Sequence, residues 1–318
     1  MKLRNHLALL VIAATLTTAG TVLAAPVFIN ILTGGTSGVY YPIGVALSQL
    51  YGAKIEGSKA SVQSTKASVE NLNLLQAGRG ELALALGDAV ADAWNGVEDA
   101  GYKKPLKKLR AVGGAYSNYI QIVASADSGI KTLNDLKGKS ISVGAPKSGT
   151  ELNSRAVFKA AGLSYADMSR VEYLPYADSV ELIKNRQLDA TLQSSGLGMA
   201  AYRDLAATMP VRFIPIPAEV VARIDSAAYQ PSKIPANTYE GQSEDVPTAA
   251  ITNIFVTHSE VSDELVYQMT RLMFENLDSL TAAHAAAKGI RLESAAKHLP
   301  IPLHPGAERF YREAGVLE

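Results

Sequence analysis

The chain has 318 residues, with 30 Lys and Arg against 30 Asp and Glu, and no cysteine. This balance of charge disfavours a nucleic-acid-binding protein, which needs a clustered basic surface. The lack of cysteine excludes disulfide bonds, a thiolate nucleophile and a metal site with cysteine ligands. A chain of this length is expected to form two domains rather than one.

The first 24 residues have the pattern of a secretory signal peptide. Lys2 and Arg4 form a short basic region, and residues 7–16 are an apolar run too short for a transmembrane span. Val22 and Ala24 supply the small residues that precede a cleavage site. We therefore expect export to the periplasm with cleavage after Ala24, an uncleaved membrane anchor being the alternative. Loss of Lys2 and Arg4 would leave a net charge of −2, and no later segment is apolar for long enough to span a bilayer.

The first part of the mature chain alternates between expected strands and helices. An apolar strand that includes Phe28 leads into the loop TGGTSG, residues 33–38, and residues 42–50 then have helical spacing. A polar strand or loop is expected at residues 61–65, a helix at 69–76 that ends at Gly78, and a buried strand at 82–86. Strands that alternate with helices indicate parallel β/α units.

The same order of elements recurs after a long extended stretch, residues 109–124. A strand at 140–143, a small-residue loop at 144–150 and a helix at 151–161 precede a strand at 171–174, a helix that starts near Asp178 and a strand at 190–192. Asp178 and Glu181 fit a capping box at the start of that helix. Residues 249–257 are strand-like again, and the chain from Asp263 onward is helical in pattern.

Two spacings strengthen the prediction of an internal repeat. Ser37 and Ser68 are 31 residues apart, as are Ser148 and Ser179, and the second serine of each pair opens the tripeptide Ser-Val-Glu. Such a repeat predicts two similar α/β lobes, each with a Gly/Ser/Thr loop at a helix N-terminus that faces a shared cleft. The two long extended stretches would form a two-strand hinge, with a discontinuous first lobe and a continuous second one.

The loop TGGTSG is the strongest local indication of a binding site. Glycine lets the backbone approach a ligand closely, and Thr36 and Ser37 add hydroxyl donors at a helix start whose dipole favours an anion. An ordinary glycine turn is the alternative. A P-loop is excluded, because the only Gly-Lys-Ser, at Gly138, has Leu133 where the first glycine should be. The glycine spacing of a dinucleotide fingerprint is also missing.

The loop PKSGT, residues 146–150, is the counterpart in the second lobe. Lys147 supplies a positive charge, and Ser148 and Thr150 can donate hydrogen bonds to a carboxylate. Lys66, in the segment STKAS, is a second cation near the predicted cleft. Either lysine alone could be a solvated surface charge, but two in facing loops favour an anionic ligand.

Catalysis and metal binding find little support in the sequence. No Gly-x-Ser-x-Gly motif is present. The histidines of the mature chain lie late in the sequence, without metal-ligand spacing, and are His258, His284, His298 and His304. We therefore expect neither a catalytic site nor a metal or cofactor.

Tyrosines lie beside the loops or on the extended stretch that joins the two lobes: Tyr40, Tyr116, Tyr119 and Tyr176. A cleft that closes on a small polar ligand often uses such rings as walls, with the hydroxyl group as a polar tip. Packing in the core is the competing interpretation for each of them.

Five segments, which occur in order from near the start of the mature chain to near its end, are TGGTSGVYYPIG, STKASVENLNLL, DLKGKSISVGAPKSGT, VPTAAITN and PLHPGAERFYREAG. Together they resemble the TAXI family, the extracytoplasmic solute receptors of tripartite TRAP transporters. The resemblance implies an α/β, two-lobed periplasmic-binding-protein fold, type II-like, that closes on its ligand. It also implies delivery to a membrane permease with a small and a large subunit, separate or fused, that is driven by an ion gradient. Relatives suggest glutamate, glutamine or dicarboxylates such as 2-oxoglutarate as ligands.

The sequence departs from the family pattern in two places. The second loop commonly reads Gly-Ser-Gly-Thr, and here Lys147 replaces the first glycine. The family often has Gln-x-Asp after the buried strand of the first lobe, where this chain has Leu86-Gly87-Asp88. Both changes lie where they could alter ligand choice, so the substrate of relatives is not transferred intact.

We therefore predict a non-catalytic periplasmic receptor for a small organic anion, delivered to the membrane subunits of a TRAP transporter. Lobe 1 would comprise residues 25–115 and 248–318, and lobe 2 residues 116–247. The residues expected to bind the ligand are Gly35, Thr36, Ser37, Tyr40, Ser64, Thr65, Ser68, Asp88, Tyr116, Lys147, Ser148, Gly149, Thr150 and Tyr176. Two alternatives stay open: a sensor receptor that presents its ligand to a signalling protein, and an enzyme on the same fold.

Overall fold

The computed structural model describes residues 26–318, so the predicted signal peptide lies outside the described residues. The strands are β1 (Val27–Leu32), β2 (Ser58–Gln63), β3 (Leu82–Leu86), β4 (Leu109–Ser125), β5 (Ser140–Ser142), β6 (Arg170–Glu172), β7 (Ala190–Ser195), β8 (Val211–Ile214), β9 (Gln230–Ile234) and β10 (Val246–His258). The α-helices are α1 (Tyr40–Lys54), α2 (Ser68–Gln76), α3 (Gly87–Asn95), α4 (Gly149–Ala160), α5 (Tyr176–Lys184), α6 (Ala200–Thr208), α7 (Ala218–Val221), α8 (Asp263–Glu275), α9 (Leu277–Ala283), α10 (Leu292–Ala295) and α11 (Pro305–Glu313). Within residues 26–318, none of the helices has the length and apolar character needed to cross a membrane.

The strands form one continuous sheet in the order β2-β1-β3-β10-β4-β7-β5-β6, with β8 on β4 and β9 on β10. β1 pairs in parallel with β2 and β3, and β5 pairs in parallel with β6 and β7. In each group the strand that comes first in the chain lies between the other two. The predicted parallel β/α units are thus confirmed, and the two groups share the same strand order.

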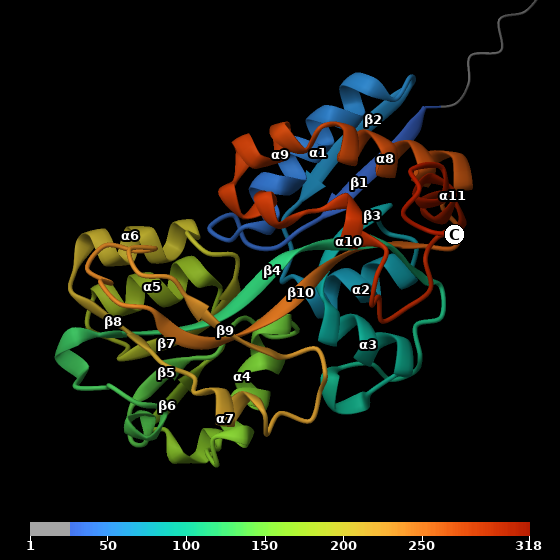
Figure 1. Ribbon diagram of the computed structural model, residues 1–318. Helices are drawn as coiled ribbons and strands as arrows, with labels where there is room; N and C mark the ends of the chain where they lie inside the picture. The colour runs from blue at the N-terminus through green and yellow to red at the C-terminus, as the bar shows by residue number, and fades with distance from the viewer. Residues whose placement is uncertain (1–25) are drawn as a thin grey trace, which may run out of the picture.

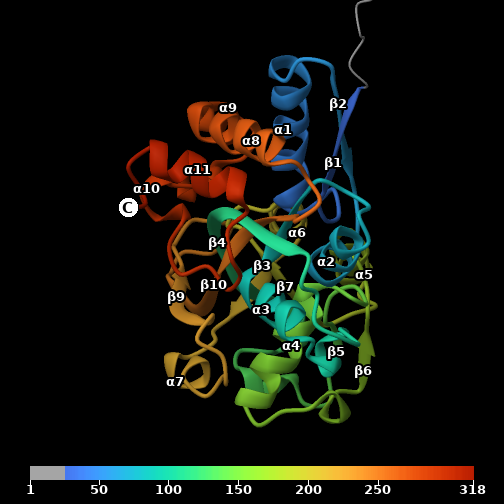
Figure 2. The ribbon, with the colours of Figure 1, turned by 90° about the vertical axis from the view of Figure 1, so that its right-hand side faces the viewer.

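β4 and β10 run antiparallel, side by side, through the middle of the molecule (Figures 1 and 2). β10 pairs with β9 up to Ala250 and with β3 from Asn253, and β4 pairs with β7 from Tyr119 onward. These two strands therefore connect what we call the first half (β1–β3, α1–α3 and α8–α11) and the second half (β5–β9 and α4–α7). They are the predicted two-strand hinge, whereas the exact residue bounds of the two lobes stay a prediction.

The part of the chain that follows β10 returns to the first half. α8 and α9 lie beside α1, and α11 packs against α8 (Figures 1 and 2). The first half is therefore built from both ends of the chain, and the second half from its middle.

Local sequence explains the elements that surround the site. Every residue of β3, LALAL, is buried, as expected for a parallel strand that is covered on both faces. In α2, Val69, Leu72 and Leu75 are buried and recur every three residues, so that one face of the helix packs on the sheet. α11 has Pro305 at its start, where proline costs no hydrogen bond, and the ring of His304 caps it.

Two details of the sequence interpretation are wrong. The helix expected to start at a capping box near Asp178 begins at Tyr176, after Pro175, so that Asp178 lies inside its first turn and no side chain caps it. The two Ser-Val-Glu tripeptides are not equivalent either, because Ser68 is the first residue of α2 and Ser179 lies three residues inside α5. The repeat lies in the order of elements and not in this match of three residues.

Candidate ligand-binding site

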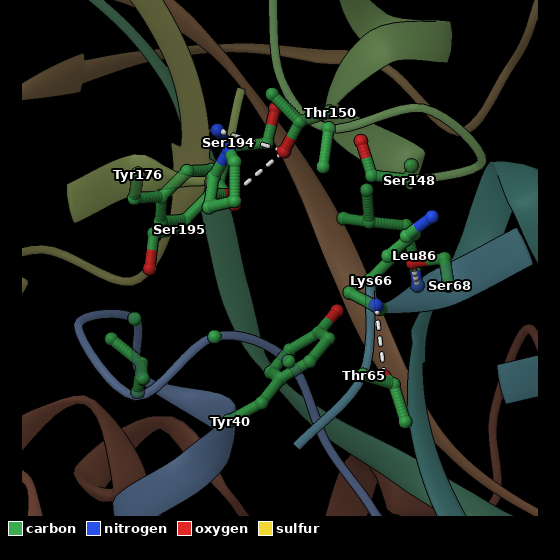
Figure 3. Close-up of a pocket in the computed structure, with 18 residues that line it drawn as sticks. Tyr40, Thr65, Lys66, Ser68, Leu86, Ser148, Thr150, Tyr176, Ser194 and Ser195 are labelled. Atoms are coloured by element: carbon green, nitrogen blue, oxygen red, sulfur yellow. Dashed lines mark hydrogen bonds between the residues drawn. The ribbon is translucent and has the colours of Figure 1, made fainter. Parts of the chain in front are cut away.

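A cavity of about 90 Å³ lies where the first and second halves meet (Figure 3). On this measure a single ordered water needs roughly 10–15 Å³, so the cavity has room for a molecule of several non-hydrogen atoms. It is lined by Gly34, Gly35, Gly38, Val39, Tyr40, Thr65, Lys66, Ala67, Ser68, Leu86, Ala145, Ser148, Gly149, Thr150, Pro175, Tyr176, Ser194 and Ser195. These residues follow the carboxyl ends of β1, β2, β3, β5, β6 and β7, which is where ligands lie in open α/β sheets.

Four helices begin at the cavity: α1 and α2 from the first half, and α4 and α5 from the second. The first amides of a helix have no partner inside the helix and carry the positive end of its dipole. Several such ends at one point favour negative charge. The arrangement is therefore suited to an anion, with backbone donors from both halves.

The start of α4 shows how the sequence builds one of these ends. Ser148 is the N-cap residue, and its Oγ accepts a hydrogen bond from the backbone N–H of Glu151 at 3.2 Å. The hydroxyl proton of Ser148 remains available to a ligand. Gly149 follows, and a Cβ there would lie 2.6 Å from Leu86 Cδ1 and 2.7 Å from Ser68 Oγ. Only glycine lets α4 approach the first half this closely.

The hydroxyl groups of the wall in the second half are already engaged with one another. Tyr176 donates to the carbonyl oxygen of Ser194 at 2.6 Å, so the hydroxyl of Thr150, 2.6 Å from the Tyr176 oxygen, must be the donor to it. Thr150 therefore has no hydroxyl proton left for the ligand, and its predicted role as an anion donor falls to its backbone amide. Figure 3 shows this wall facing Tyr40 across the cavity.

The tyrosines that line the cavity are neutral. Burial raises the pKa of Tyr176 to about 12. Burial, and after it the neighbouring Tyr176, also raises the pKa of Tyr40 well above its ordinary value. The Tyr40 hydroxyl donates a hydrogen bond to Asn253 Oδ1 at 2.5 Å. Asn253 lies in β10, so a cavity wall is bonded directly to one of the two hinge strands.

Lys66 is the only charged side chain among the described residues that line the cavity. It lies in the loop before α2, and its backbone N–H donates to the carboxylate of Glu70 at 2.6 Å. Lys147 is exposed, as Lys66 is, but it lines a separate surface depression with Arg155 and Tyr173. Its φ of 63° turns the loop, and its carbonyl accepts a hydrogen bond from the N–H of Glu70 at 3.2 Å. The structure therefore places Lys147 outside the cavity where the sequence analysis expected it to contact the ligand.

The structure brings many of the predicted site residues together at the cavity: Gly35, Tyr40, Thr65, Ser68, Ser148, Gly149, Thr150 and Tyr176. It places six others elsewhere: Thr36, Ser37, Ser64, Asp88, Tyr116 and Lys147.

Each displaced residue has a local reason. Thr36 is exposed, and the carbonyl of Ser37 accepts a hydrogen bond from the N–H of Ala201 at 3.3 Å. The hydroxyl of Ser64 donates to the carbonyl of Gly34 at 2.9 Å and so shapes the loop.

Two further predicted residues are buried outside the cavity. Tyr116 packs edge-on against Tyr40, with 6.5 Å between ring centroids, as the competing interpretation of core packing proposed. Asp88 is bonded across the seam between the two halves, to Asn153 and Tyr229.

The main residues that the sequence interpretation missed are Ser194 and Ser195. They form the carboxyl end of β7, as Leu86 does for β3 in the first half. A polar pair directly after an apolar strand of the second parallel unit was the available indication. Among residues 26–318, no group of three or more His, Asp or Glu side chains is placed to hold a metal ion.

Two halves that are joined by paired strands and enclose a cavity define the architecture of periplasmic solute-binding proteins. A solved structure described as a periplasmic transporter matches with a TM-score of 0.57 at 13% identity, over 91% of this chain and 92% of that one. The binding protein component of an ABC phosphonate transporter from Pseudomonas aeruginosa matches with a TM-score of 0.53 at 13% identity, over 84% of this chain and 80% of that one. These likenesses confirm the predicted fold class.

The family follows from a longer match. Residues 31–315 match the model of the NMT1-like family, and the chain belongs to that family.

Proposed function

We propose that this protein is an extracytoplasmic receptor of the TAXI type, which captures a small organic anion and delivers it to a TRAP-type permease. The observation that carries the proposal is the meeting of four helix N-termini, two from each half, at one small cavity beside Lys66. The ligand is a carboxylate, such as glutamate or a C4 or C5 dicarboxylate.

Binding draws on donors from both halves. The amides at the starts of α2 and α4, the hydroxyls of Ser68 and Ser148 and the ammonium of Lys66 supply hydrogen bonds and positive charge. A ligand held in this way favours the closed arrangement because it contacts both halves at once.

The composition of the cavity supports binding rather than catalysis. Among residues 26–318, its lining contains no carboxylate, imidazole or thiol that could act as a base or a nucleophile. The hydroxyl of Ser148 is bonded to a backbone amide and not to a base.

Thermal unfolding of the purified protein, stripped of carried-over ligand by denaturation and refolding, tests the ligand class. The panel contains glutamate, 2-oxoglutarate and succinate, together with methylphosphonate, methanesulfonate, glutamine and arginine. A ligand at a hundred times its dissociation constant adds about 2.7 kcal/mol to stability. We expect a shift with at least one carboxylate. A shift with the phosphonate or sulfonate alone would contradict the proposal that the ligand is a carboxylate. A shift with glutamine or arginine alone, neither of which has a net negative charge, would contradict the proposal that the ligand is an anion.

Delivery to a TRAP-type permease is supported by the five segments that resemble TAXI receptors. Uptake of the bound carboxylate into proteoliposomes that contain the permease subunits, under an ion gradient, tests this step. We expect uptake only when the receptor is added. Uptake that is independent of the receptor, with capture of the loaded receptor by a signalling protein instead, would favour the sensor alternative.

A further inference from the structure

Asp88, at the start of α3, is a buried carboxylate held by donors from the opposite half. It is 7% exposed. Its Oδ2 accepts hydrogen bonds from the hydroxyl of Tyr229 at 2.7 Å and from the amide of Asn153 at 2.8 Å, and its Oδ1 accepts from the N–H of Ala89 at 2.8 Å. Tyr229 and Asn153 belong to the second half, so these two bonds require the halves to be in contact.

The bonds to Asp88 determine which way the amide of Asn153 points. One amide proton goes to Asp88 and the other to the oxygen of Tyr229 at 2.7 Å. The carbonyl oxygen of Asn153 therefore faces Ser194, whose hydroxyl donates to it at 2.6 Å. Ser194 lines the cavity, and its backbone carbonyl oxygen accepts a hydrogen bond from the hydroxyl of Tyr176. A continuous chain of bonds thus runs from the first half, through α4, to the far wall of the cavity.

We infer that Asp88 is a positioning residue of the anion site: on closure it orients Asn153, which orients Ser194 and the wall behind it. The inference rests on the proposed function, because it concerns the same cavity. It gives Asp88 a role different from the ligand contact expected from the sequence.

The free-energy terms for burying Asp88 are compatible with reversible closure of the two halves. When the halves separate, Asp88 faces water. On closure it exchanges that water for neutral donors, and burial of a carboxylate is unfavourable unless hydrogen bonds replace its hydration. Hydrogen bonds to a charged group typically change an equilibrium by about tenfold to a hundredfold. Such bonds can retain a ligand without holding the empty receptor shut.

The test measures the dissociation rate of L-glutamate, 2-oxoglutarate and succinate by stopped-flow fluorescence of Trp94, the single tryptophan, in α3. The variants are Asp88→Asn, Ser194→Ala and the double variant. Within residues 26–318, Asn153 is the one residue that is hydrogen-bonded to both Asp88 and Ser194, so a coupling between them reports the relay. Tyr229→Phe gives a second route to the same loss. Asp92→Asn, in the same helix, removes a carboxylate without a bond to the second half and is the matched control.

We expect Asp88→Asn and Tyr229→Phe each to raise the dissociation rate about tenfold, with the association rate and ligand-free midpoint unchanged. In the Ser194→Ala background, the effect of Asp88→Asn should fall to about twofold. The relay would be overturned if the two effects on the dissociation rate simply multiplied in the double variant, or if Asp92→Asn raised that rate as much as Asp88→Asn. In either case, binding of a carboxylate by the unmodified protein would still support the proposed function. If none of the three probes binds the unmodified protein, both the proposed ligand class and this inference fail.

Discussion

Gly149→Ala separates closure over the ligand from the stability of each half. The added Cβ would lie 2.6 Å from Leu86 Cδ1, whereas ordinary contact begins at 3.4 Å, a shortfall of 0.8 Å. The atoms that it meets belong to the first half, so the strain falls on the closed arrangement alone. Overpacking typically costs about 1–3 kcal/mol, which corresponds to a dissociation constant roughly 5- to 150-fold weaker.

Without ligand, the same substitution should be harmless. Gly149 opens α4 without a positive φ, and alanine is favoured over glycine in helices by up to about 1 kcal/mol. We therefore expect an unchanged or slightly higher thermal midpoint for the ligand-free protein, and weaker binding of the carboxylate by calorimetry.

A matched control exists on the other side of the cavity. Gly38 also faces the opposite half, but a Cβ there would lie 3.5 Å from the ring of Tyr176, an ordinary contact. The dissociation constant of Gly38→Ala for the carboxylate should therefore lie within about twofold of that of the unmodified protein. This is well below the tenfold change that corresponds to about 1.4 kcal/mol. Equal affinities for Gly149→Ala and Gly38→Ala, or a large loss of ligand-free stability in Gly149→Ala, would refute the reasoning.

Other substitutions test the charge, pH and packing of the structure. Lys66→Gln should weaken carboxylate binding about tenfold, which is the effect of losing a hydrogen bond to a charged group. Lys147→Gln should leave the affinity unchanged. Equal losses of affinity in the two variants, measured by calorimetry, would contradict the placement of the two lysines. Burial and the charge of Asp88 raise the pKa of Asp92 to about 6. The folded protein then binds a proton more tightly than the unfolded chain, so this group stabilises it most below about pH 4, the ordinary carboxyl pKa, and the contribution is lost as the pH rises through 6. Asp92→Asn should therefore gain more stability over the unmodified protein at pH 7 than at pH 4 in urea unfolding, and equal gains would argue against a raised pKa. Gly306→Ala would place Cβ 2.1 Å from the carbonyl oxygen of Asp263, so the free energy of unfolding of the ligand-free protein should fall by about 1–3 kcal/mol through overpacking, with unchanged affinity. An affinity that fell in parallel would show that this contact is linked to closure.

Much of the local structure could be predicted from sequence because it depends on neighbours along the chain. The expected strand at 82–86 is β3, and the helix at 69–76 differs from α2 by one residue. The glycine and serine loops also lie at helix starts, as short-range patterns of small residues and apolar spacing indicate. These patterns were sufficient to predict parallel β/α units with small-residue loops at the ends of their strands, whereas the binding of an anion there stays a prediction.

The direction of individual side chains was beyond such patterns. Lys147 has the expected sequence position, but a positive φ in its loop turns it to the outer surface. Ser194 and Ser195 reach the cavity because β7 lies next to β4 and β5 in the sheet. Neither fact can be read from residues nearby in the chain.

The sequence by itself determined the elements and their order, since propensity and hydrophobic spacing act over a few residues. The tertiary structure decided which of those residues share a cavity and which of them join the two halves. Asp88 meets Asn153 across 65 residues of chain and Tyr229 across 141. Contacts of this kind form only when both halves are folded and packed, because burial and hydrogen bonding between distant segments, rather than local preference, select them.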